Sequence, residues 1–293
     1  MSKFFTIKQK IGLGVVAVLL ALTVVAWQEV FKITGPHYLK IDVLDIGQGD
    51  SIFIETPAMR RILIDGGPGT KVLQKLAERL PFWEKHFDMV ILTHPDADHL
   101  VGLLSVLQKY QVDYIVWTGI VRDGAAYQEW LELLEKQKAR GAKIIIASLH
   151  TNIGSGGVVF DTLHPFENLE GQDFSKAGND TGIVLRAAYG QKSFLFTGDI
   201  SSKVEQEMIE ENIPVAADVL KVPHHGSKYS SSETFLAAVH PSLAAISVSA
   251  DNSYGHPTPE VLQRLQKFGI TTLITDQYGD IKLVSDGNNI NIK

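Results

Sequence analysis

The residues best suited to chemistry lie in one short stretch, Thr93-His94-Pro95-Asp96-Ala97-Asp98-His99. It holds two imidazoles and two carboxylates, which are the usual protein ligands of a catalytic divalent metal. Without a cation, the two carboxylates would repel each other, and desolvation would tend to neutralise one of them. The stretch therefore predicts a metal site. The alternative is a solvated acidic loop with two incidental histidines.

The flanking segments must position this stretch. Residues 89–92 form a short apolar run, which predicts a buried strand. Leu100, Leu103, Leu104 and Leu107 recur at i, i+3, i+4 and i+7, which is typical of one face of a helix. The stretch therefore belongs to a loop between a strand and a helix, where α/β proteins build their sites.

The pattern His94-x-Asp96-x-Asp98-His99 resembles the metal motif of the metallo-β-lactamase superfamily, usually written H-x-H-x-D-H. The aspartate at the third position departs from that form and resembles the hydrolase domain of the ComEC/Rec2 competence proteins. The likeness extends from about residue 39 to about residue 281. Further stretches that carry it are Asp45-Ile46-Gly47-Gln48-Gly49-Asp50-Ser51, Leu63-Ile64-Asp65-Gly66-Gly67, Thr197-Gly198-Asp199, Leu220-Lys221-Val222-Pro223-His224-His225-Gly226-Ser227 and Tyr254-Gly255-His256-Pro257.

This resemblance implies an α/β (α+β) fold, a four-layer αββα sandwich, over residues 37–293. The sequence itself indicates alternating strands and helices up to about residue 147. We assign no element to residues 150–178, which are polar and rich in glycine. Strands at 271–275 and 280–284 are expected at the edges of the sheets.

The candidate metal ligands combine imidazoles with carboxylates, and they are His94, Asp96, Asp98, His99, Asp199 and His224. Asp199 follows a buried strand pattern, where a carboxylate can bridge two metals roughly 3.5–4 Å apart. Its alternative role is to cap the helix that follows. Only one of the adjacent His224 and His225 is expected to bind metal, because neighbours in an extended chain point in opposite directions. We assign His224 to the metal and leave the choice open.

Three further residues are expected to support the ligands. Asp65 ends a strand before two glycines, where a carboxylate commonly orients a ligand histidine through its second ring nitrogen. The resemblance implies that Asp50 faces the site. It also places Asn179 where many superfamily members carry a histidine. With Asp96 also replacing a histidine, one metal position is rich in oxygen, which favours a harder ion such as Mn²⁺ or leaves the position weakly filled. The expected cofactor is one or two divalent ions, zinc or manganese.

The candidate catalytic residues are Asp98, His225 and His256. We expect hydrolysis by metal-activated water, which Asp98 would orient, with His256 or the free member of the histidine pair protonating the leaving group. The resemblance implies a phosphodiester substrate, such as single-stranded DNA. The alternatives are a hydrolase of the same fold acting on a lactone, thioester or other small ester, and a non-catalytic metal-containing binding module.

Composition limits the possible partners. The chain has no cysteine, which excludes disulfides, thiolate metal ligands and a cysteine nucleophile. Of its 27 basic and 33 acidic residues, residues 1–36 hold four and one, so the remainder has 23 against 32, a net charge of −9. That balance is not typical of a protein that grips nucleic acid tightly by its backbone charge. It mildly favours a small substrate over DNA.

The N-terminal segment predicts a membrane anchor. Residues 11–27 contain no charged side chain and follow Lys3, Lys8 and Lys10. We favour an uncleaved single-pass span at residues 11–27, within an N-terminal anchor and linker of about residues 1–36. The linker is expected over residues 29–37, and the hydrolase domain outside the cytoplasm. The alternative is a cleaved signal peptide and a secreted protein. Since ComEC proteins also supply a multi-span channel, a role in DNA uptake would need a separate channel partner.

Overall fold

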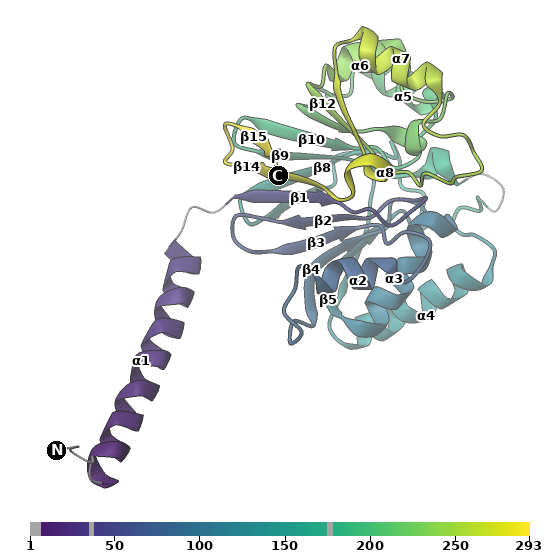
Figure 1. Ribbon diagram of the computed structural model, residues 1–293. Helices are drawn as coiled ribbons and strands as arrows, with labels where there is room; N and C mark the ends of the chain where they lie inside the picture. The colour runs from purple at the N-terminus through teal and green to yellow at the C-terminus, as the bar shows by residue number, and fades with distance from the viewer. Residues whose placement is uncertain (1–6, 35–37, 175–177) are drawn as a thin grey trace. The chain divides into compact units, whose positions relative to one another are not determined.

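The computed structural model describes residues 7–34, 38–174 and 178–293 (Figure 1). The chain divides into two compact units, residues 1–37 and residues 38–293. Each unit is described by itself below.

Helix α1 (Ile7–Thr34) belongs to the first unit. Its segment Ile7–Trp27 has a mean hydropathy of 2.2, and none of it is buried within the structure. These 21 residues extend about 30 Å as a helix, which matches the hydrocarbon core of a bilayer. The prediction that a linker begins at residue 29 is wrong, because the helix continues to Thr34 through a stretch without glycine or proline. The predicted break at Gly35-Pro36 lies outside the described residues.

Two β-sheets form the centre of the second unit. The first has the order β15-β14-β1-β2-β3-β4-β5-β6 and the second the order β13-β12-β11-β10-β9-β8-β7. The first sheet contains β1 (Leu39–Val43), β2 (Ile52–Glu55), β3 (Arg61–Ile64), β4 (His86–Ile91), β5 (Gln111–Trp117), β6 (Lys143–Ile146), β14 (Ile281–Ser285) and β15 (Ile290–Ile292). The second contains β7 (Asn152–Ser155), β8 (Val158–His164), β9 (Val184–Tyr189), β10 (Lys192–Phe196), β11 (Val219–Lys221), β12 (Leu243–Ile246) and β13 (Thr271–Ile274).

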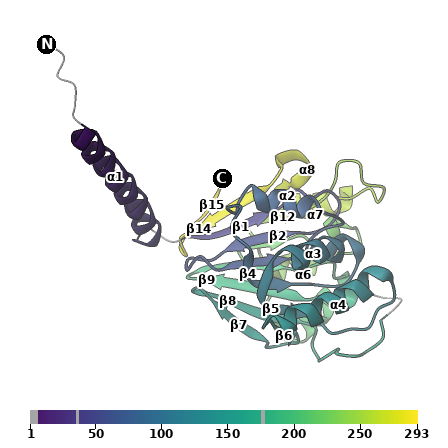
Figure 2. The ribbon, with the colours of Figure 1, turned by 90° about the horizontal axis from the view of Figure 1, so that it is seen from below.

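Helices cover the outer face of each sheet (Figures 1 and 2). The first sheet carries α2 (Lys71–Ala77), α3 (Ala97–Lys109) and α4 (Ala125–Ala139). The second carries α5 (Ser202–Glu210), α6 (Glu233–Val239) and α7 (Pro259–Lys267), and the short α8 (Thr275–Tyr278) follows β13. The predicted αββα sandwich is therefore confirmed.

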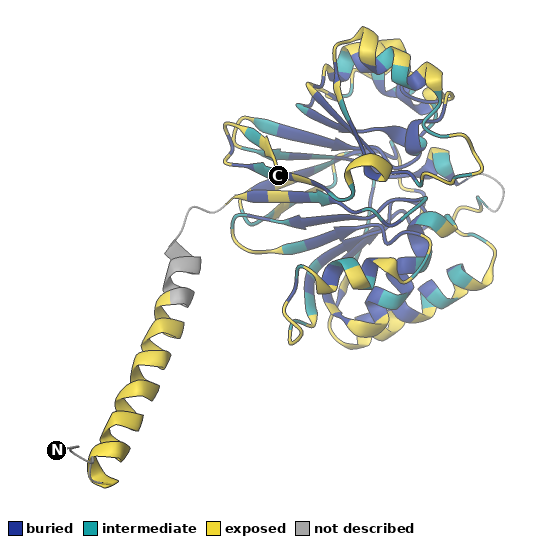
Figure 3. Ribbon diagram, in the orientation of Figure 1, coloured by how far each residue is buried: buried dark blue, intermediate teal, exposed yellow. Residues whose placement is uncertain are grey.

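Apolar side chains fill the space between the sheets. Figure 3 shows that much of the strands that face this space is buried. Ile54 and Ile62 from the first sheet and Phe160 from the second are fully buried there. Separate apolar clusters lie under the helices on both sides. Strands with helices on one face and a second sheet on the other are apolar on both faces, which explains the continuous runs in β3 and β4.

Two of our expectations differ from the structure. Residues 150–178 contain β7 and β8, and the alternation of β8, with Val159 exposed and Phe160 buried, is typical of a strand. The second expectation was that β14, the strand predicted at residues 280–284, would lie at the edge of its sheet. Residues 290–292 form β15 and pair outside it, so β14 lies between β15 and β1. β13 does lie at an edge.

Backbone contacts fix the start of α3. A side chain at Gly102 would overlap the carbonyl oxygen of Gly66, so the helix touches the loop after β3 without side chains between them. The Gly66 amide donates to the His99 carbonyl at 2.8 Å, and the Gly102 amide donates to the Gly67 carbonyl at 2.8 Å. The first turn of α3, which carries Asp98 and His99, is therefore held by main chain.

Candidate metal centre

The loops that carry the predicted ligands meet at one end of the two sheets. Strands β3 and β4 run parallel in the first sheet, and β10 and β11 run parallel in the second. Asp65 follows β3, the stretch 93–99 follows β4, and Asp199 and the histidine pair follow β10 and β11. The carboxyl ends of parallel strands are the usual place for a site in such folds.

Four of these residues converge on one point. One ligand atom each from Asp98, His99, Asp199 and His225 can be chosen so that all lie within 4.8 Å of one another. Nε2 of His99 is 3.4 Å from Oδ1 of Asp199. Nε2 of His225 is 3.3 Å from Oδ2 of Asp199 and 3.4 Å from Oδ2 of Asp98. Two imidazoles and two carboxylates thus face a common centre, drawn from both sheets.

The partners of these imidazoles set which nitrogen faces the centre. Nδ1 of His99 lies 2.7 Å from Oδ2 of Asp65, and Nδ1 of His225 lies 2.9 Å from the Ser247 carbonyl. Both partners are acceptors, so each Nδ1 carries the proton, and a neutral ring presents the Nε2 lone pair to the centre. This is the arrangement by which proteins orient metal-binding histidines.

His94 is oriented by the same carboxylate through a hydroxyl. The Thr93 hydroxyl donates to Oδ2 of Asp65 at 2.7 Å and lies 3.1 Å from Nδ1 of His94. Because that hydroxyl has given its only proton to Asp65, Nδ1 of His94 must donate to it. The Thr93 amide also donates to Oδ1 of Asp65 at 2.8 Å. Asp65 therefore orients both His94 and His99.

Unpartnered buried atoms show that a cation fits. Nε2 of His94, His99 and His225 and Oδ1 of Asp199 are buried and have no hydrogen-bond partner among the described residues. Leaving such an atom unsatisfied costs about 1–3 kcal/mol, so clusters of them are rare without a function. All four atoms are metal donors; three belong to the converging residues, and the His94 ring adjoins that of His99 at a centroid distance of 4.1 Å. The site therefore fits a divalent ion, and the donors suit zinc or manganese.

The electrostatics of the centre point the same way. Burial lowers the pKa of His225, but Asp199, Asp98 and Asp50 outweigh it and raise that pKa to about 10. Burial likewise lowers the pKa of His99, and Asp199 and Asp65 raise it well above its ordinary value. The acids therefore create a negative potential that attracts positive charge, from either a proton or a metal ion.

Lys221 is a buried partner of the site that our reading of the sequence missed. Its side chain is 1% exposed, and its Nζ lies 2.8 Å from Oδ2 of Asp50. The Asp50 amide donates to the Asp98 carbonyl at 3.2 Å, and Oδ1 of Asp50 is 3.5 Å from Nδ1 of His225. The lysine thus holds Asp50 beside the centre. Its signal was a charged residue in the otherwise apolar run 219–222.

Asp96 lies beside the four-residue centre and has its own cation. Nη2 of Arg122 donates to Oδ1 of Asp96 at 2.8 Å. Oδ2 of Asp96 is 3.8 Å from Nε2 of His94. Sequence reasoning predicted Asp96 as a ligand and did not identify Arg122, which is distant in the chain and has no spacing that marks it.

The histidine pair differs from our assignment. His225 belongs to the centre, whereas His224 lies outside it, with Nδ1 3.5 Å from Nδ2 of Asn179. Both histidines have positive φ, 50° and 54°, so they form a left-handed turn, and the argument from an extended chain does not apply. Asn179 is thus placed beside His224 in the structure.

His256 lies next to His224. The centroids of the two rings are 5.7 Å apart. Asn252 holds the His256 backbone, accepting from its amide at 2.9 Å and donating to its carbonyl at 2.7 Å. Burial, His224 and His225 lower the pKa of His256. Its ring is therefore neutral at neutral pH.

Comparison with known proteins identifies the family. Residues 44–249 match the metallo-beta-lactamase superfamily, which is more than half of the chain. The chain belongs to the metallo-beta-lactamase superfamily. Among curated members, the ComE operon protein 3 of Bacillus subtilis (strain 168) is 33% identical over 266 residues, which cover 83% of this chain and 32% of that protein.

Two other relatives agree. The competence protein ComA of Neisseria gonorrhoeae is 31% identical and is matched over 83% of this chain and 32% of its own length. Recombination protein 2 of Haemophilus influenzae is 27% identical, with 91% of this chain and 31% of that protein covered. The chain therefore spans about a third of the length of these relatives. It is a superfamily member related to competence proteins, and the fold supports a metal-dependent hydrolase.

Comparison with solved structures supports the same fold. The metallo-beta-lactamase fold protein YhfI of Bacillus subtilis superposes with a TM-score of 0.57 at 14% identity and covers 85% of this chain and 100% of its own. CmlA of Streptomyces venezuelae, described as a diiron beta-hydroxylase, has a TM-score of 0.50 at 14% identity, covering 81% of this chain and 52% of its own. These likenesses support the architecture alone, since one superfamily fold carries different chemistries.

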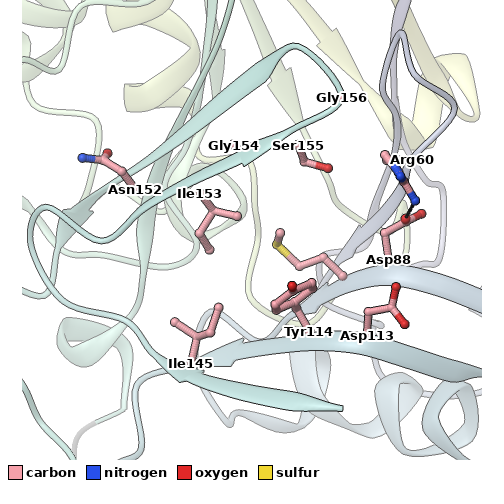
Figure 4. Close-up of a pocket in the computed structure, with 11 residues that line it drawn as sticks. Arg60, Asp88, Asp113, Tyr114, Ile145, Asn152, Ile153, Gly154, Ser155 and Gly156 are labelled. Carbon is pink, nitrogen blue, oxygen red and sulfur yellow. Dashed lines mark hydrogen bonds and ion pairs between the residues drawn. The ribbon is translucent and has the colours of Figure 1, made fainter. Parts of the chain in front are cut away.

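A second group of similar residues lies at the other end of β4. His86, Asp88 and Asp113 also place potential ligand atoms within 4.8 Å of one another. Asp88 and Asp113 line a cavity of about 580 Å³ between β4, β5 and β7 (Figure 4). Here each group has a protein partner: His86 contacts Asp113 at 2.9 Å, and Asp88 accepts from Arg60 at 2.9 Å. The potential ligand atoms of this group are therefore paired within the protein, without a metal ion.

Proposed function

We propose that this superfamily member is a phosphodiesterase that cleaves single-stranded DNA outside the cytoplasm. The observation that carries the proposal is the convergence of Asp98, His99, Asp199 and His225, whose buried donor atoms include several without a protein partner. The names of the relatives, competence and recombination proteins, support DNA as the substrate. Since the chain spans about a third of those proteins, their whole activities do not transfer automatically.

The protein groups divide the work of hydrolysis. When bound, a divalent ion would supply a water of lowered pKa and a Lewis acid, and the four converging residues would hold it. Burial raises the pKa of Asp98, but the neighbouring His225, whose Nε2 is 3.4 Å away, and His99 outweigh burial and lower that pKa to about 2. Asp98 is therefore ionised at neutral pH and can accept a hydrogen bond from the attacking water.

The candidate proton donors to the leaving oxygen are two histidines outside the four-residue centre. His224 and His256 lie beside the centre without belonging to the four-residue group. The lowered pKa of His256 leaves its ring mostly without the proton that it would have to donate at neutral pH. We therefore assign the proton donor to His224. This selects one of the two donors that the sequence suggested, because His224 is the member of the pair that lies outside the four-residue centre.

Exposed aromatic rings next to the centre support a single-stranded substrate. Tyr254 is 69% exposed, and its ring stacks on His256 at a centroid distance of 5.8 Å and an angle of 24°. Tyr229 is 67% exposed and follows the histidine turn, with Nζ of Lys228 5.1 Å from its ring centroid. Proteins bind single strands on such rings, because unstacked bases pack on them at about 1–3 kcal/mol each.

The location of the reaction rests on α1. We propose that Ile7–Trp27 anchors the chain in the cell membrane, with Lys8 and Lys10 on the cytoplasmic side and the hydrolase domain outside. Cleavage of this segment as a signal peptide would give a secreted enzyme instead. In DNA uptake, the chain would act beside a separate channel protein.

The test is an activity comparison with the full chain in detergent. The purified chain is stripped of metal and assayed with Mn²⁺, Mg²⁺ or Zn²⁺ on labelled single-stranded DNA, duplex DNA, an aryl phosphodiester and a lactone. We expect cleavage of the single strand, strongest in Mn²⁺ and lost in Asp98→Asn. Asp276→Asn, an exposed change on α8, is the matched control and retains the wild-type rate.

Two results would contradict the proposal. If Asp98→Asn cleaved DNA at the wild-type rate in Mn²⁺, the catalytic assignment would be wrong. If the lactone were turned over and DNA were not, the chain would be a small-ester hydrolase. The net charge of −9 over residues 37–293 is the one observation that favours that second function. Full metal loading without turnover of any substrate would indicate a binding module.

A further inference from the structure

Arg122 lies where its charge bears on the number of metal ions. We propose that the Arg122 guanidinium takes the place of a second metal ion beside His94 and Asp96, so that the chain binds one divalent ion tightly. The inference rests on the metal centre of the proposed function. It does not depend on the substrate being DNA.

The contact between Arg122 and Asp96 is built into the fold. Nη2 of Arg122 donates to Oδ1 of Asp96 at 2.8 Å, and the two side chains are 19% and 29% exposed. The backbone of Gly178 closes over the pair, because a side chain at Gly178 would overlap Nη1 of Arg122 and lie 2.7 Å from Oδ1 of Asp96. A charge-assisted hydrogen bond in a partly buried place is stronger than an exposed ion pair.

The donors are distributed unequally between the two possible positions. The four-residue centre has two imidazoles and both oxygens of Asp199, since Oδ1 faces His99 at 3.4 Å and Oδ2 faces His225 at 3.3 Å. Beside it, His94 offers one nitrogen, and its ring centroid is 4.1 Å from that of His99. Oδ2 is the oxygen of Asp96 that the Arg122 hydrogen bond does not engage, and it is 3.8 Å from that nitrogen.

The amide that could complete a second position faces another residue. Nδ2 of Asn179 lies 3.5 Å from Nδ1 of His224. An amide is also a weaker ligand than the imidazole it replaces. A second dication would therefore have few donors and would lie against a guanidinium that cannot lose its proton. The charge that two-metal hydrolases obtain from a second ion is here supplied by an arginine.

The experiment counts ions bound to the full chain in detergent. Metal-stripped protein is titrated with Mn²⁺ by equilibrium dialysis with elemental analysis, and electron paramagnetic resonance reports whether bound ions are magnetically coupled. We expect one tightly bound Mn²⁺ per wild-type chain, with an uncoupled signal. In Arg122→Gln, we expect a second ion to bind at least about tenfold more tightly than any second ion in the wild type, with a coupled signal.

Two further variants make the count decisive. Arg140→Gln changes an exposed arginine after α4 and is expected to keep the wild-type count. Asp96→Asn is also expected to keep one ion, because Asp96 serves Arg122. This second variant keeps the inference testable if Arg122→Gln does not fold, which circular dichroism would show.

Specific results would overturn the inference. Two ions bound with similar affinity by the wild type, an unchanged count in folded Arg122→Gln, or loss of the ion in Asp96→Asn would each contradict it while leaving the metal centre in place. If the wild type bound no ion at all, the centre itself and the proposed function would fall too. Metal counting therefore separates the two failures.

Discussion

The two ends of β4 carry similar residue types with opposite consequences. At its start, His86 and Asp113 are partly exposed and pair with each other at 2.9 Å. Beyond its end, His94 and His99 are buried, and their Nε2 atoms have no partner among the residues that the structure describes. Both ends belong to groups of histidine and aspartate close enough to hold an ion. The composition of the group therefore does not separate them.

The two ends of β4 differ in whether their potential ligand atoms already have protein partners. At the start of β4, Asp88 accepts from the Arg60 guanidinium and from the Arg61 amide, so its charge is already neutralised. Beyond the end of β4, Nδ1 of both His94 and His99 has an acceptor, and neither Nε2 has a hydrogen-bond partner among the described residues. A buried cluster with unpaired donors costs free energy unless a ligand completes it. That difference predicts which end binds metal.

The largest effect is expected from removing the shared carboxylate. In Asp199→Asn, the centre loses the group whose two oxygens face both His99 and His225. We expect the affinity for Mn²⁺ to fall by more than about 100-fold, since even changes behind the ligands cost about 10–100-fold. Titration of the stripped chain measures this. Asp88→Asn at the other end is the control, and equal losses in both variants would erase the comparison.

A smaller effect is expected from Asp65→Asn. The Asp65 carboxylate accepts from the Thr93 amide, the Thr93 hydroxyl and Nδ1 of His99. An amide cannot accept all three bonds, so the two histidines lose their fixed orientation. We expect a loss of about 10–100-fold in metal affinity. A variant that binds Mn²⁺ as the wild type does would show that Asp65 does not orient the ligands.

A third acidic group, Asp280, also has cationic partners from the protein, and the pH dependence of its effect on stability tests the same distinction. Asp280 contacts Lys75 at 2.8 Å and Arg79 at 2.6 Å. Burial raises its pKa, but those hydrogen bonds outweigh burial and hold it below 3.8. A carboxyl group whose pKa is lower in the folded than in the unfolded chain stabilises the fold at pH values above its unfolded pKa. This contribution is lost as the pH falls through the folded pKa.

Asp280→Asn tests that contribution. We expect it to cost about 1–2 kcal/mol of unfolding free energy at pH 7 and less below pH 3.8, where Asp280 takes up a proton in the unfolded chain before it does so in the folded one. Urea unfolding at both pH values measures the difference, with Asp276→Asn as the exposed control. A cost that stayed constant down to pH 3 would contradict the assigned cause.

The smallest effect is expected at the start of β4. Asp113→Asn weakens a half-exposed pair, so we expect a change in unfolding free energy within about 0.5 kcal/mol and no change in bound Mn²⁺. Dialysis with elemental analysis measures the count. Loss of an ion in this variant would place a metal at the wrong end of β4 and reverse the comparison.

Local sequence predicted much of the fold and the residues around the centre. Most strands and helices follow their hydrophobic periodicity, and the dense stretch after β4 marks the loop where Asp98 and His99 lie. The strands of residues 150–178 were missed because polar and glycine residues hide the short alternation of β8. The roles of the site residues as ligands stay predictions until metal is measured.

The rest depends on contacts that spacing does not encode. Arg122 reaches Asp96 from a loop 26 residues away, and Lys221 reaches Asp50 from another sheet. The choice between His224 and His225 depends on a left-handed turn that two consecutive non-glycine residues rarely adopt. Tertiary structure decides each of these, so the sequence could supply the candidates but not their pairing.

The contact between Gly66 and Gly102 has a consequence for how the protein can change. Since main-chain contact sets how closely the start of α3 approaches the loop after β3, we expect that apolar residues beneath the helix can be exchanged for others of similar volume while Asp98 and His99 keep their positions. Variation in that core is thus uncoupled from the chemistry. An alanine at Gly102 would instead lift the helix and displace both groups together, although it touches neither.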